Sequence, residues 1–514
     1  MTGLLAQFEQ PQIPVPPQGP APLELPQVDW LAVGPEVALV VAALILVLLA
    51  ALNRGRRDLS GLYLDLSLAG VAASALVTAR LWSVVTDEAP YQALAGMVAV
   101  DGFSVFARLV ILAATALGLL VSQGYLRREG LEGPEGHALM LMSASGMLLM
   151  TSANDLIVVF LALEILSIAL YVLAAFDRRR LESQEAGLKY FVLGSFSSAV
   201  FLYGVALCYG ATGTTSLSGI AAFLAGSTLF SSGLLLGGVA FILVGLAFKV
   251  AAVPFHMWTP DVYQGAPSPV TGFMAAGAKA AGFAALLRVF GSAFDAYSVD
   301  WRPLAWVLAV ASLVVGSVVA IVQEDVKRML AYSSIGHAGY VLMGFQADTG
   351  GGFASALFYL LAYTFMVVGS FAVVSVVGRR GDRRHRLDDY RGLGARQPLL
   401  AGALTLFLLA QAGVPLTSGF MAKFSVFSAS IDAREYALTI VGVLAAVVAM
   451  FFYLRLIVLM YMTAPDDTDT GAGSGFELDA ATGTALALAA VATVVLGVLP
   501  GPVLDFAERA TLLF

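Results

Sequence analysis

Fourteen apolar segments of about 20 residues, each long enough to cross a bilayer as a helix, follow one another along this chain. Lipid offers no hydrogen bonds to an exposed backbone, so such segments are expected to be helical. Only 12% of the 514 residues are charged, about half the share in soluble proteins. The sequence therefore predicts an all-α polytopic membrane protein. The segments span residues 31–53, 61–83, 103–125, 137–153, 155–176, 186–210, 234–256, 267–289, 303–323, 327–346, 353–378, 398–430, 436–462 and 481–505.

The regions between these segments contain no soluble module, which predicts one continuous helical domain over residues 31–514. Residues 1–30 hold seven of the 20 prolines and no lysine or arginine. Such a stretch favours an extended extramembrane tail and lacks the basic start of a signal peptide.

The distribution of basic residues predicts the orientation of the chain. If the N-terminus lies outside, the loops that fall inside hold 17 lysines and arginines, whereas the outer loops and the C-terminus hold five. Because loops rich in lysine and arginine stay on the inner side, both termini are expected outside.

Two of the predicted spans contain a proline near a lysine. Pro254 follows Lys249, and Pro415 precedes Lys423. A proline removes one helical hydrogen bond and clashes with the carbonyl four residues back, which for Pro415 is that of Gln411. Broken helices at matching places in two halves are typical of inverted-repeat transporters.

The two predicted repeats are residues 137–289 and residues 303–462, each with five spans and one broken helix.

Several ionisable side chains lie inside the predicted spans. Glu164 and Lys279 lie near the middle of their spans, and Lys249 and Lys423 lie at the breaks. A charge at the centre of a membrane helix costs roughly 2.5–3.5 kcal/mol on lenient scales, so these residues are candidates for a proton path. The structural alternative is a set of static ion pairs that hold helices together.

Two further residues are candidates with a plain structural alternative. Lys189 lies a few residues into its span and can extend its ammonium to the interface. His337 carries an imidazole, which titrates near neutral pH in water, but a lone membrane histidine is often a packing residue.

Other chemistry lacks support in the sequence. The chain has one cysteine, Cys208, and its four histidines lack metal-ligand spacing, so no disulfide, zinc site or iron–sulfur cluster is expected. A phosphate-binding loop, a nucleophile elbow and a basic nucleic-acid patch are also missing from the sequence. We therefore expect no cofactor in this chain and no nucleic-acid partner.

Five ordered motifs resemble the antiporter-like subunits of respiratory NADH-quinone oxidoreductase. The motifs are LALEILSIALYVLAAF, EAGLKYFVLGSFSSAVFLYG, FKVAAVPFHMWTPDVYQGAPSPV, DVKRMLAYSSIGHAGY and GVPLTSGFMAKFSVF. The resemblance covers roughly residues 137–462. The chain is shorter than subunit L of that family, and a lysine rather than a glutamate at position 423 argues against subunit M.

The resemblance implies a membrane-arm subunit that translocates protons while other subunits pass electrons from NADH to quinone. It assigns the proton path to Glu164, Lys189, Lys249, Lys279, His337 and Lys423. Flavin and iron–sulfur clusters are expected in partner subunits, with subunits M and K as neighbours, in the plasma (inner) membrane of a bacterium.

Three alternatives remain open on the sequence. A subunit of a multisubunit sodium/proton antiporter or of a membrane-bound hydrogenase shares these motifs. A non-conducting assembly subunit would use the same buried charges only to join helices. A stand-alone permease is disfavoured, because nothing in the sequence indicates a substrate pocket for more than protons or small cations.

Overall fold

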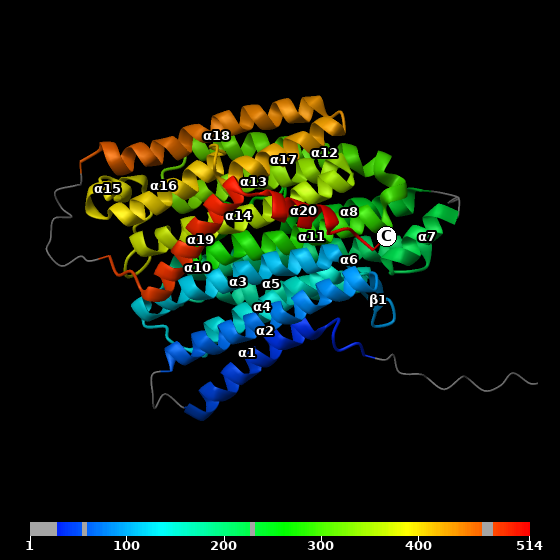
Figure 1. Ribbon diagram of the computed structural model, residues 1–514, viewed down its shortest axis with the longest axis horizontal. Helices are drawn as coiled ribbons and strands as arrows, with labels where there is room; N and C mark the ends of the chain where they lie inside the picture. The colour runs from blue at the N-terminus through cyan, green and yellow to red at the C-terminus, as the bar shows by residue number, and fades with distance from the viewer. Residues whose placement is uncertain (1–27, 54–58, 227–231, 465–475, 514) are drawn as a thin grey trace, which may run out of the picture.

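The computed structural model describes residues 28–53, 59–226, 232–464 and 476–513. Within these ranges the chain is an elongated bundle of helices that lie side by side, with α1 at one edge and α18 at the other (Figure 1). Most of the predicted proline-rich tail, three of the counted basic residues (Arg54, Arg56 and Arg57) and part of the loop before the last span lie outside the described residues.

The fourteen predicted spans each coincide with a helix or a broken helix. Among the described residues, ten helical stretches are long and apolar enough to cross a membrane by length and composition. The other four predicted ranges correspond to α4, α8, α13 and the α16–α17 pair, so the count of fourteen stays a prediction. The helices are α1 (Gly34–Asn53), α2 (Ser60–Asp87), α3 (Gly102–Glu129), α4 (Pro134–Ser152), α5 (Leu156–Ala174), α6 (Leu181–Thr212), α7 (Leu217–Gly226), α8 (Gly233–Lys249), α9 (Trp258–Gly265), α10 (Ser268–Phe273), α11 (Lys279–Arg288), α12 (Ser298–Ile321), α13 (Val326–Ala347), α14 (Gly350–Val377), α15 (Leu393–Arg396), α16 (Pro398–Ala412), α17 (Ser418–Asp432), α18 (Tyr436–Met462), α19 (Ala480–Val498) and α20 (Gly501–Arg509).

Helices in the two halves pack in the same order. In the first half α4 packs on α5 and α11, α5 on α6, and α6 on both α8 and α9. In the second half α12 packs on α13 and α18, α13 on α14, and α14 on both α16 and α17. The fold is thus the expected all-α membrane architecture with a broken helix in each half, while the residue limits of the repeats stay predictions.

Both predicted breaks occur as non-helical segments. Helix α8 ends at Lys249 and α9 begins at Trp258, whereas α16 ends at Ala412 and α17 begins at Ser418. Gly413 closes α16 in the left-handed region with φ of 93°, which glycine adopts without steric cost. Each break therefore leaves a helix end inside the bundle.

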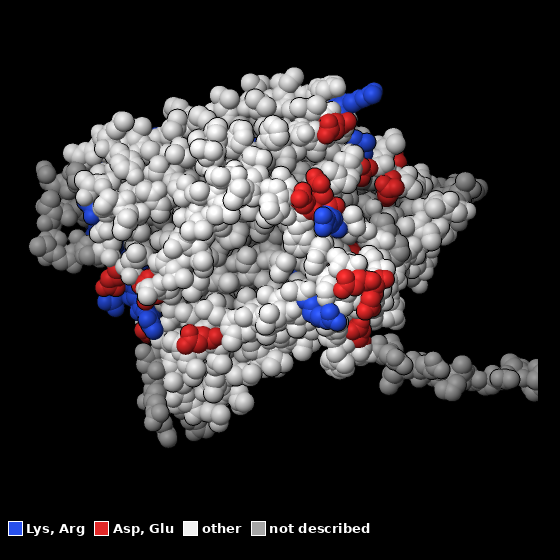
Figure 2. All heavy atoms as spheres, in the orientation of Figure 1, with Lys and Arg blue, Asp and Glu red and all other residues white. Residues whose placement is uncertain are grey.

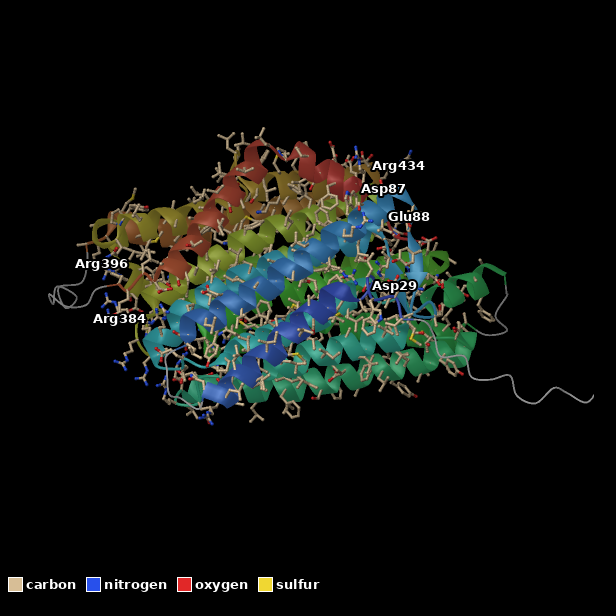
Figure 3. All side chains as sticks on the ribbon, turned by 60° about the horizontal axis from the view of Figure 1, so that its bottom comes forward. Asp29, Asp87, Glu88, Arg384, Arg396 and Arg434 are labelled. Carbon is tan, nitrogen blue, oxygen red and sulfur yellow. The ribbon has the colours of Figure 1, made fainter. Side chains whose placement is uncertain are left out.

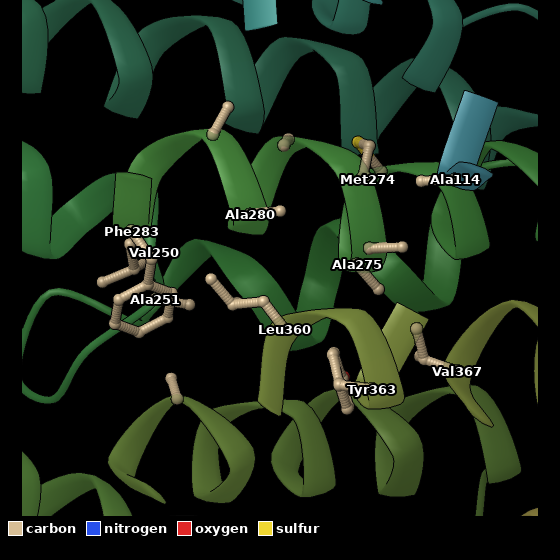
Figure 4. Packing of buried hydrophobic residues seen from close by; sticks show 14 of the residues in the cluster. Ala114, Val250, Ala251, Met274, Ala275, Ala280, Phe283, Leu360, Tyr363 and Val367 are labelled. Carbon is tan, nitrogen blue, oxygen red and sulfur yellow. The ribbon is translucent and has the colours of Figure 1, made fainter. Parts of the chain in front are cut away.

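One irregularity was not predicted from the sequence. A π-helical turn, η1 (Met274–Ala278), lies between α10 and α11 and ends directly before Lys279. Figure 4 shows Ala275 and Ala280 of this central segment close to α14, from which Leu360 and Tyr363 extend. Small residues let neighbouring membrane helices approach closely, and a π-turn often marks a functional position.

A short antiparallel hairpin also lay outside the prediction. Strands β1 (Tyr91–Ala93) and β2 (Val98–Val100) pair between α2 and α3. The hairpin lies at the end of the bundle (Figure 1).

Charged residues gather at the two ends of the bundle, and the surface between them is largely uncharged in the face that Figure 2 shows. Arg384 and Arg396 mark one end, whereas Asp29, Asp87, Glu88 and Arg434 mark the other (Figure 3). We call the first the arginine-rich end. This distribution is the one expected of a chain that crosses a bilayer along the long direction of its helices.

A buried carboxylate at the arginine-rich end joins the two halves. Asp382, in the loop after α14, accepts from Arg180 at 3.0 Å, from Lys327 at 3.3 Å and from the Ser268 hydroxyl at 2.8 Å. His385 Nε2 lies 2.9 Å from the same carboxylate. Burial alone would raise the pKa of the Asp382 carboxyl, but the charges of Lys327, His385 and Arg180 hold it well below its usual range. Its stabilising effect is therefore present above the ordinary carboxyl pKa and is lost only as the pH falls through the depressed value.

Replacing Asp382 with Asn is expected to destabilise the fold by about 3–5 kcal/mol, because the cations around it would remain buried without a counter-charge. Thermal unfolding of the detergent-purified chain measures this effect. The matched control is Asp388→Asn, whose side chain is 61% exposed and pairs with Arg391, and which should cost less than about 1 kcal/mol. Equal midpoints for the two variants would contradict the role of Asp382.

Candidate functional site

Lys249, the last residue of α8, ends the first half-helix with its ammonium inside the bundle. Its side chain is 5% exposed, and its Nζ donates to the Ser167 hydroxyl at 2.8 Å and to the Tyr190 hydroxyl at 3.2 Å. The same ammonium lies 5.4 Å from the centroid of the Tyr190 ring. The lysine is thus held by neutral groups from α5 and α6.

Glu164 lies near this ammonium without touching it. It precedes Ser167 by three residues on α5, so the two side chains share one face of the helix. The carboxylate is close enough to act on Lys249 through space, yet the hydrogen bonds of Lys249 go to Ser167 and Tyr190. Glu164 is half-buried, and its Oε1 is buried with no hydrogen-bond partner. Carboxylate and ammonium are therefore separated in this structure.

Lys279 lies on α11, one turn before Gly282, and Gly282 is where this helix packs against Lys249. A Cβ on Gly282 would lie 3.3 Å from Lys249 Cγ, so the backbone of α11 passes directly beside this lysine. The Lys279 ammonium donates to the Ser334 carbonyl at 2.6 Å and also contacts the Ser334 hydroxyl. It lies 5.6 Å from the Tyr363 ring centroid. Lys279 thus connects the first half of the chain to α13.

A hydrogen-bonded cluster continues from α13. The hydroxyls of Ser333 and Tyr453 lie 2.5 Å apart, and Tyr453 lies 3.3 Å from His337 Nε2. On its other side, His337 Nδ1 lies 2.7 Å from the Tyr359 hydroxyl. Ser333 also donates to Gln411 Oε1 at 3.3 Å. Hydroxyl groups can both donate and accept, so this cluster has the chemistry needed to pass a proton.

Lys423 is bound by the broken end of α16. Its Nζ donates to the carbonyls of Gln411 at 2.9 Å and Ala412 at 2.8 Å. The Gln411 carbonyl is the one that the sequence singled out as freed by Pro415. Carbonyls at a helix C-terminus carry partial negative charge, so the break supplies a site for an ammonium in place of a carboxylate.

A cavity of about 10 Å³ adjoins this lysine. It is lined in part by Lys423, His337, Tyr453 and Gln411, and a volume of about this size is the smallest that holds one water. The cavity lies between Lys423 and the tyrosine–histidine cluster.

Lys189 has different surroundings from the other predicted lysines. Its side chain is 40% exposed and pairs with Glu185 and Asp261, each at 2.7 Å. Asp261 in turn pairs with Arg328 at 2.6 Å. Within the described residues, Lys189 has no ion pair with another predicted site residue.

The structure therefore brings Lys249, Lys279, His337 and Lys423 into one buried row, places Glu164 beside its first member and leaves Lys189 in a separate ion-pair chain. The row leads from α5 and α8 in the first half of the chain, through α11 and α13, to α17 in the second half.

The neutral members of this row were not predicted from the sequence. They are Ser167, Tyr190, Ser333, Ser334, Tyr359, Gln411 as a side chain, and Tyr453. A signal existed for some of them, because Ser167 lies one turn from Glu164, and Ser333 and Ser334 lie one turn from His337. Tyr453 lies on a distant helix and gave no signal.

Comparison with known proteins identifies the family. The transmembrane family described as NADH:quinone oxidoreductase/Mrp antiporter matches residues 153–449. This match covers more than half of the chain, so the chain belongs to that family, and the resemblance found in the sequence is confirmed.

Individual relatives agree with the family match. A protein of Trichlorobacter lovleyi named NADH-quinone oxidoreductase subunit N is 42% identical over 445 residues, which cover 87% of this chain and 90% of that protein. A chain in the structure of respiratory complex I from Thermus thermophilus with bound aureothin is 34% identical, with a TM-score of 0.75 over 92% of this chain and 98% of that one. A chain of the Mrp complex from Dietzia sp. DQ12-45-1b has a TM-score of 0.82 over 93% of this chain and 97% of that one at 22% identity, which shows the shared fold alone.

Gly413→Ala is expected to disturb the Lys423 site. The new Cβ would lie 2.9 Å from Lys423 Cδ, and a left-handed backbone costs a residue with a Cβ about 1–2 kcal/mol. We expect a loss of at least that size in thermal unfolding of the purified chain. The matched control is Gly402→Ala in α16, the helix that Gly413 caps. The Cβ position of Gly402 has open space around it, so this variant should leave the stability unchanged or raise it. A Gly413 variant as stable as the control would contradict the close approach.

Proposed function

We propose that this chain works as subunit N in the membrane arm of an NADH-quinone oxidoreductase and translocates protons there, while electrons pass from NADH to quinone in other subunits. The observation that carries the proposal is the row of buried lysines, joined by neutral hydroxyl and carbonyl groups, that crosses the bundle. The names of the relatives support the assignment to an NADH-quinone oxidoreductase. The row of lysines supports proton translocation as the role of this chain in that complex.

The separation of Glu164 from Lys249 supplies a switch in this proposal. A carboxylate about 4 Å from an ammonium stabilises it by roughly 4 kcal/mol at an effective dielectric near 20. A movement that brings Glu164 to Lys249 would hold the proton there, and a movement apart would release it. When the carboxylate is distant, the hydroxyls of Ser167 and Tyr190 accept hydrogen bonds from the Lys249 ammonium.

The released proton then passes along the row. Lys279 receives it through water or the adjoining side chains, and the Ser333–Tyr453–His337 cluster carries it towards Lys423. The carbonyls of Gln411 and Ala412 stabilise the charged Lys423 until it discharges to the outer side. Moving each charge against the membrane potential requires about 2.3 kcal/mol per 100 mV, so the energy enters from neighbouring subunits.

The proposal places the arginine-rich end on the inner side of a bacterial plasma membrane, with both termini outside, because arginine-rich loops stay inside. Flavin and iron–sulfur clusters belong to partner subunits in this proposal. Within the described residues, no group of three or more histidine, cysteine, aspartate or glutamate side chains is arranged to hold a metal ion. Subunits M and K are the proposed neighbours.

A cation/proton antiporter is the second candidate, since the family includes Mrp proteins and a chain of an Mrp complex shares the fold. Co-purification decides between the two candidates. Flavin and iron–sulfur spectra with NADH-quinone activity support the oxidoreductase, whereas colourless membrane partners support the antiporter.

Glu164→Gln and Lys249→Met are each expected to lower NADH-driven proton translocation by about tenfold, equivalent to roughly 1.4 kcal/mol of lost coupling. Proton uptake by proteoliposomes of the purified complex measures the effect. Glu324→Gln removes an acid whose side chain is 74% exposed and should change nothing. Complexes that assemble fully and pump at the normal rate in both variants would refute the assigned roles.

Tyr453→Phe is expected to lower the rate of NADH-driven proton translocation several-fold. The substitution deletes the hydroxyl between Ser333 and His337, and a lost hydrogen bond costs about 1 kcal/mol. Tyr436→Phe removes an equivalent hydroxyl from the exposed start of the same helix and serves as the control. If both variants pump equally well, the cluster does not carry protons.

A further inference from the structure

Two cavities meet at the arginine-rich end, outside the lysine row. The first, which we call the basic pocket, has a volume of about 380 Å³ and lies between the ends of α3 and α14 and the segment before α19. The second, which we call the apolar groove, has a volume of about 1360 Å³ and lies between α1, α2, α4, α5 and α6. Gly130 lines both, so the two cavities adjoin.

The basic pocket has the lining expected of a phosphate site. Its charged residues are Arg127, Arg128, Arg379 and Arg380, opposed by Glu477. Each guanidinium carries five N–H donors in a fixed fork that suits phosphate oxygens. Arg127 contacts Ser60 through Nε and Nη2 and pairs with Asp479 through Nη1, each at 3.4 Å. These long contacts use three of its five N–H donors.

The apolar groove has the lining expected of acyl chains. Its walls include Val47, Leu139, Val172 and Phe191, which belong to helices that coincide with predicted membrane spans. Its volume exceeds the roughly 300–1,000 Å³ of ordinary small-molecule pockets. An apolar groove next to a phosphate site suits a phospholipid, because the groove can bind the acyl chains while the basic pocket binds the phosphate.

The charges at the junction select the headgroup. The segment from Gly130 to Glu135, which includes the first two residues of α4, forms one rim of the groove and carries Glu132 and Glu135. Arg178 is the basic residue of the groove lining. Among the lining residues that the structure describes, the basic pocket thus has excess positive charge, and the adjoining rim, with two glutamates against one arginine, has excess negative charge. A zwitterionic headgroup carries a negative phosphate followed by a positive ammonium. Its phosphate would therefore face the arginines of the basic pocket while its ammonium faces the glutamates of the rim.

We propose that this composite site binds one phospholipid with an ethanolamine headgroup. Arg127 and Arg380 hold its phosphate, Glu132 and Glu135 face its ammonium, and its acyl chains occupy the groove. A primary ammonium donates hydrogen bonds to carboxylates, which the quaternary amine of choline cannot do. The proposal is independent of proton translocation, because lipid retention is its readout.

The test uses the whole complex, purified from its native membrane, delipidated with detergent and reconstituted into phosphatidylcholine nanodiscs that contain phosphatidylethanolamine or, in a second set, phosphatidylglycerol. Native mass spectrometry measures the lipid retained by this subunit. The wild type is expected to retain phosphatidylethanolamine over both other lipids.

Substitution of both phosphate-binding arginines, Arg127→Gln with Arg380→Gln, should lower this retention about 25-fold, since each arginine near a lipid headgroup contributes roughly a factor of five. The control, Arg386→Gln with Arg391→Gln, removes the same charge from side chains that are 70% and 42% exposed and should retain the lipid. Equal retention in the two double variants would overturn the proposal.

A second pair of variants tests the groove. Ala50→Trp places an indole in the groove and should lower retention at least fivefold, whereas Ala51→Trp, on the exposed side of α1, should not. Three outcomes would overturn the proposal: preference for phosphatidylglycerol, no retained lipid in the wild type because a partner helix fills the groove, and displacement of the lipid by inorganic phosphate alone.

Discussion

A charge inside a bilayer must be bonded by the protein itself, and this requirement shapes the whole functional site. Lys423 meets it with two carbonyls from a broken helix, Lys249 with two hydroxyls, and Lys279 with the backbone and side chain of one serine. Glu164, at the edge of the row, instead keeps one buried carboxylate oxygen without a hydrogen-bond partner among the described residues. The row thus holds three lysines and a histidine with neutral partners, and one carboxylate with an unpaired oxygen at its edge. In the proposed mechanism, a movement of the Glu164 carboxylate can therefore change the proton affinity of Lys249.

The same requirement explains the ends of the bundle. Asp382 is buried together with Arg180, Lys327 and His385, so its charge is compensated several times over. At the opposite end, Arg288 binds both oxygens of Asp101 at 2.8 Å. The Asp382 cluster ties helices from both halves together, and the Arg288–Asp101 pair ties the end of α11 to the start of α3. The middle of the bundle carries the row of lysines with neutral ligands. The ends of the bundle thus pair buried charges with opposite charges, whereas the lysines of the row are bound by neutral groups.

Most of the fold could be predicted, because a membrane-length apolar segment has few alternatives to a helix. The positions of Lys249, Lys279 and Lys423 could also be predicted, since lysines stand out in such segments. The partners of these lysines could not be predicted, because Tyr453 and Ser333 are 120 positions apart and ordinary in composition. The π-turn before Lys279 left no mark in hydropathy. Lys189 shows the opposite case, in which a lysine inside an apolar segment reaches the ion pairs of a neighbouring helix.

The broken end of α16 couples shape to charge. An unbroken helix bonds its own carbonyls, whereas the carbonyls of Gln411 and Ala412 are capped by an ammonium that comes from the next half-helix. The proton on Lys423 is therefore part of the joint between α16 and α17, and its departure removes the charge that the helix end attracts. In the proposed proton path, loss of the proton from Lys423 would therefore also weaken the contact that joins the two half-helices.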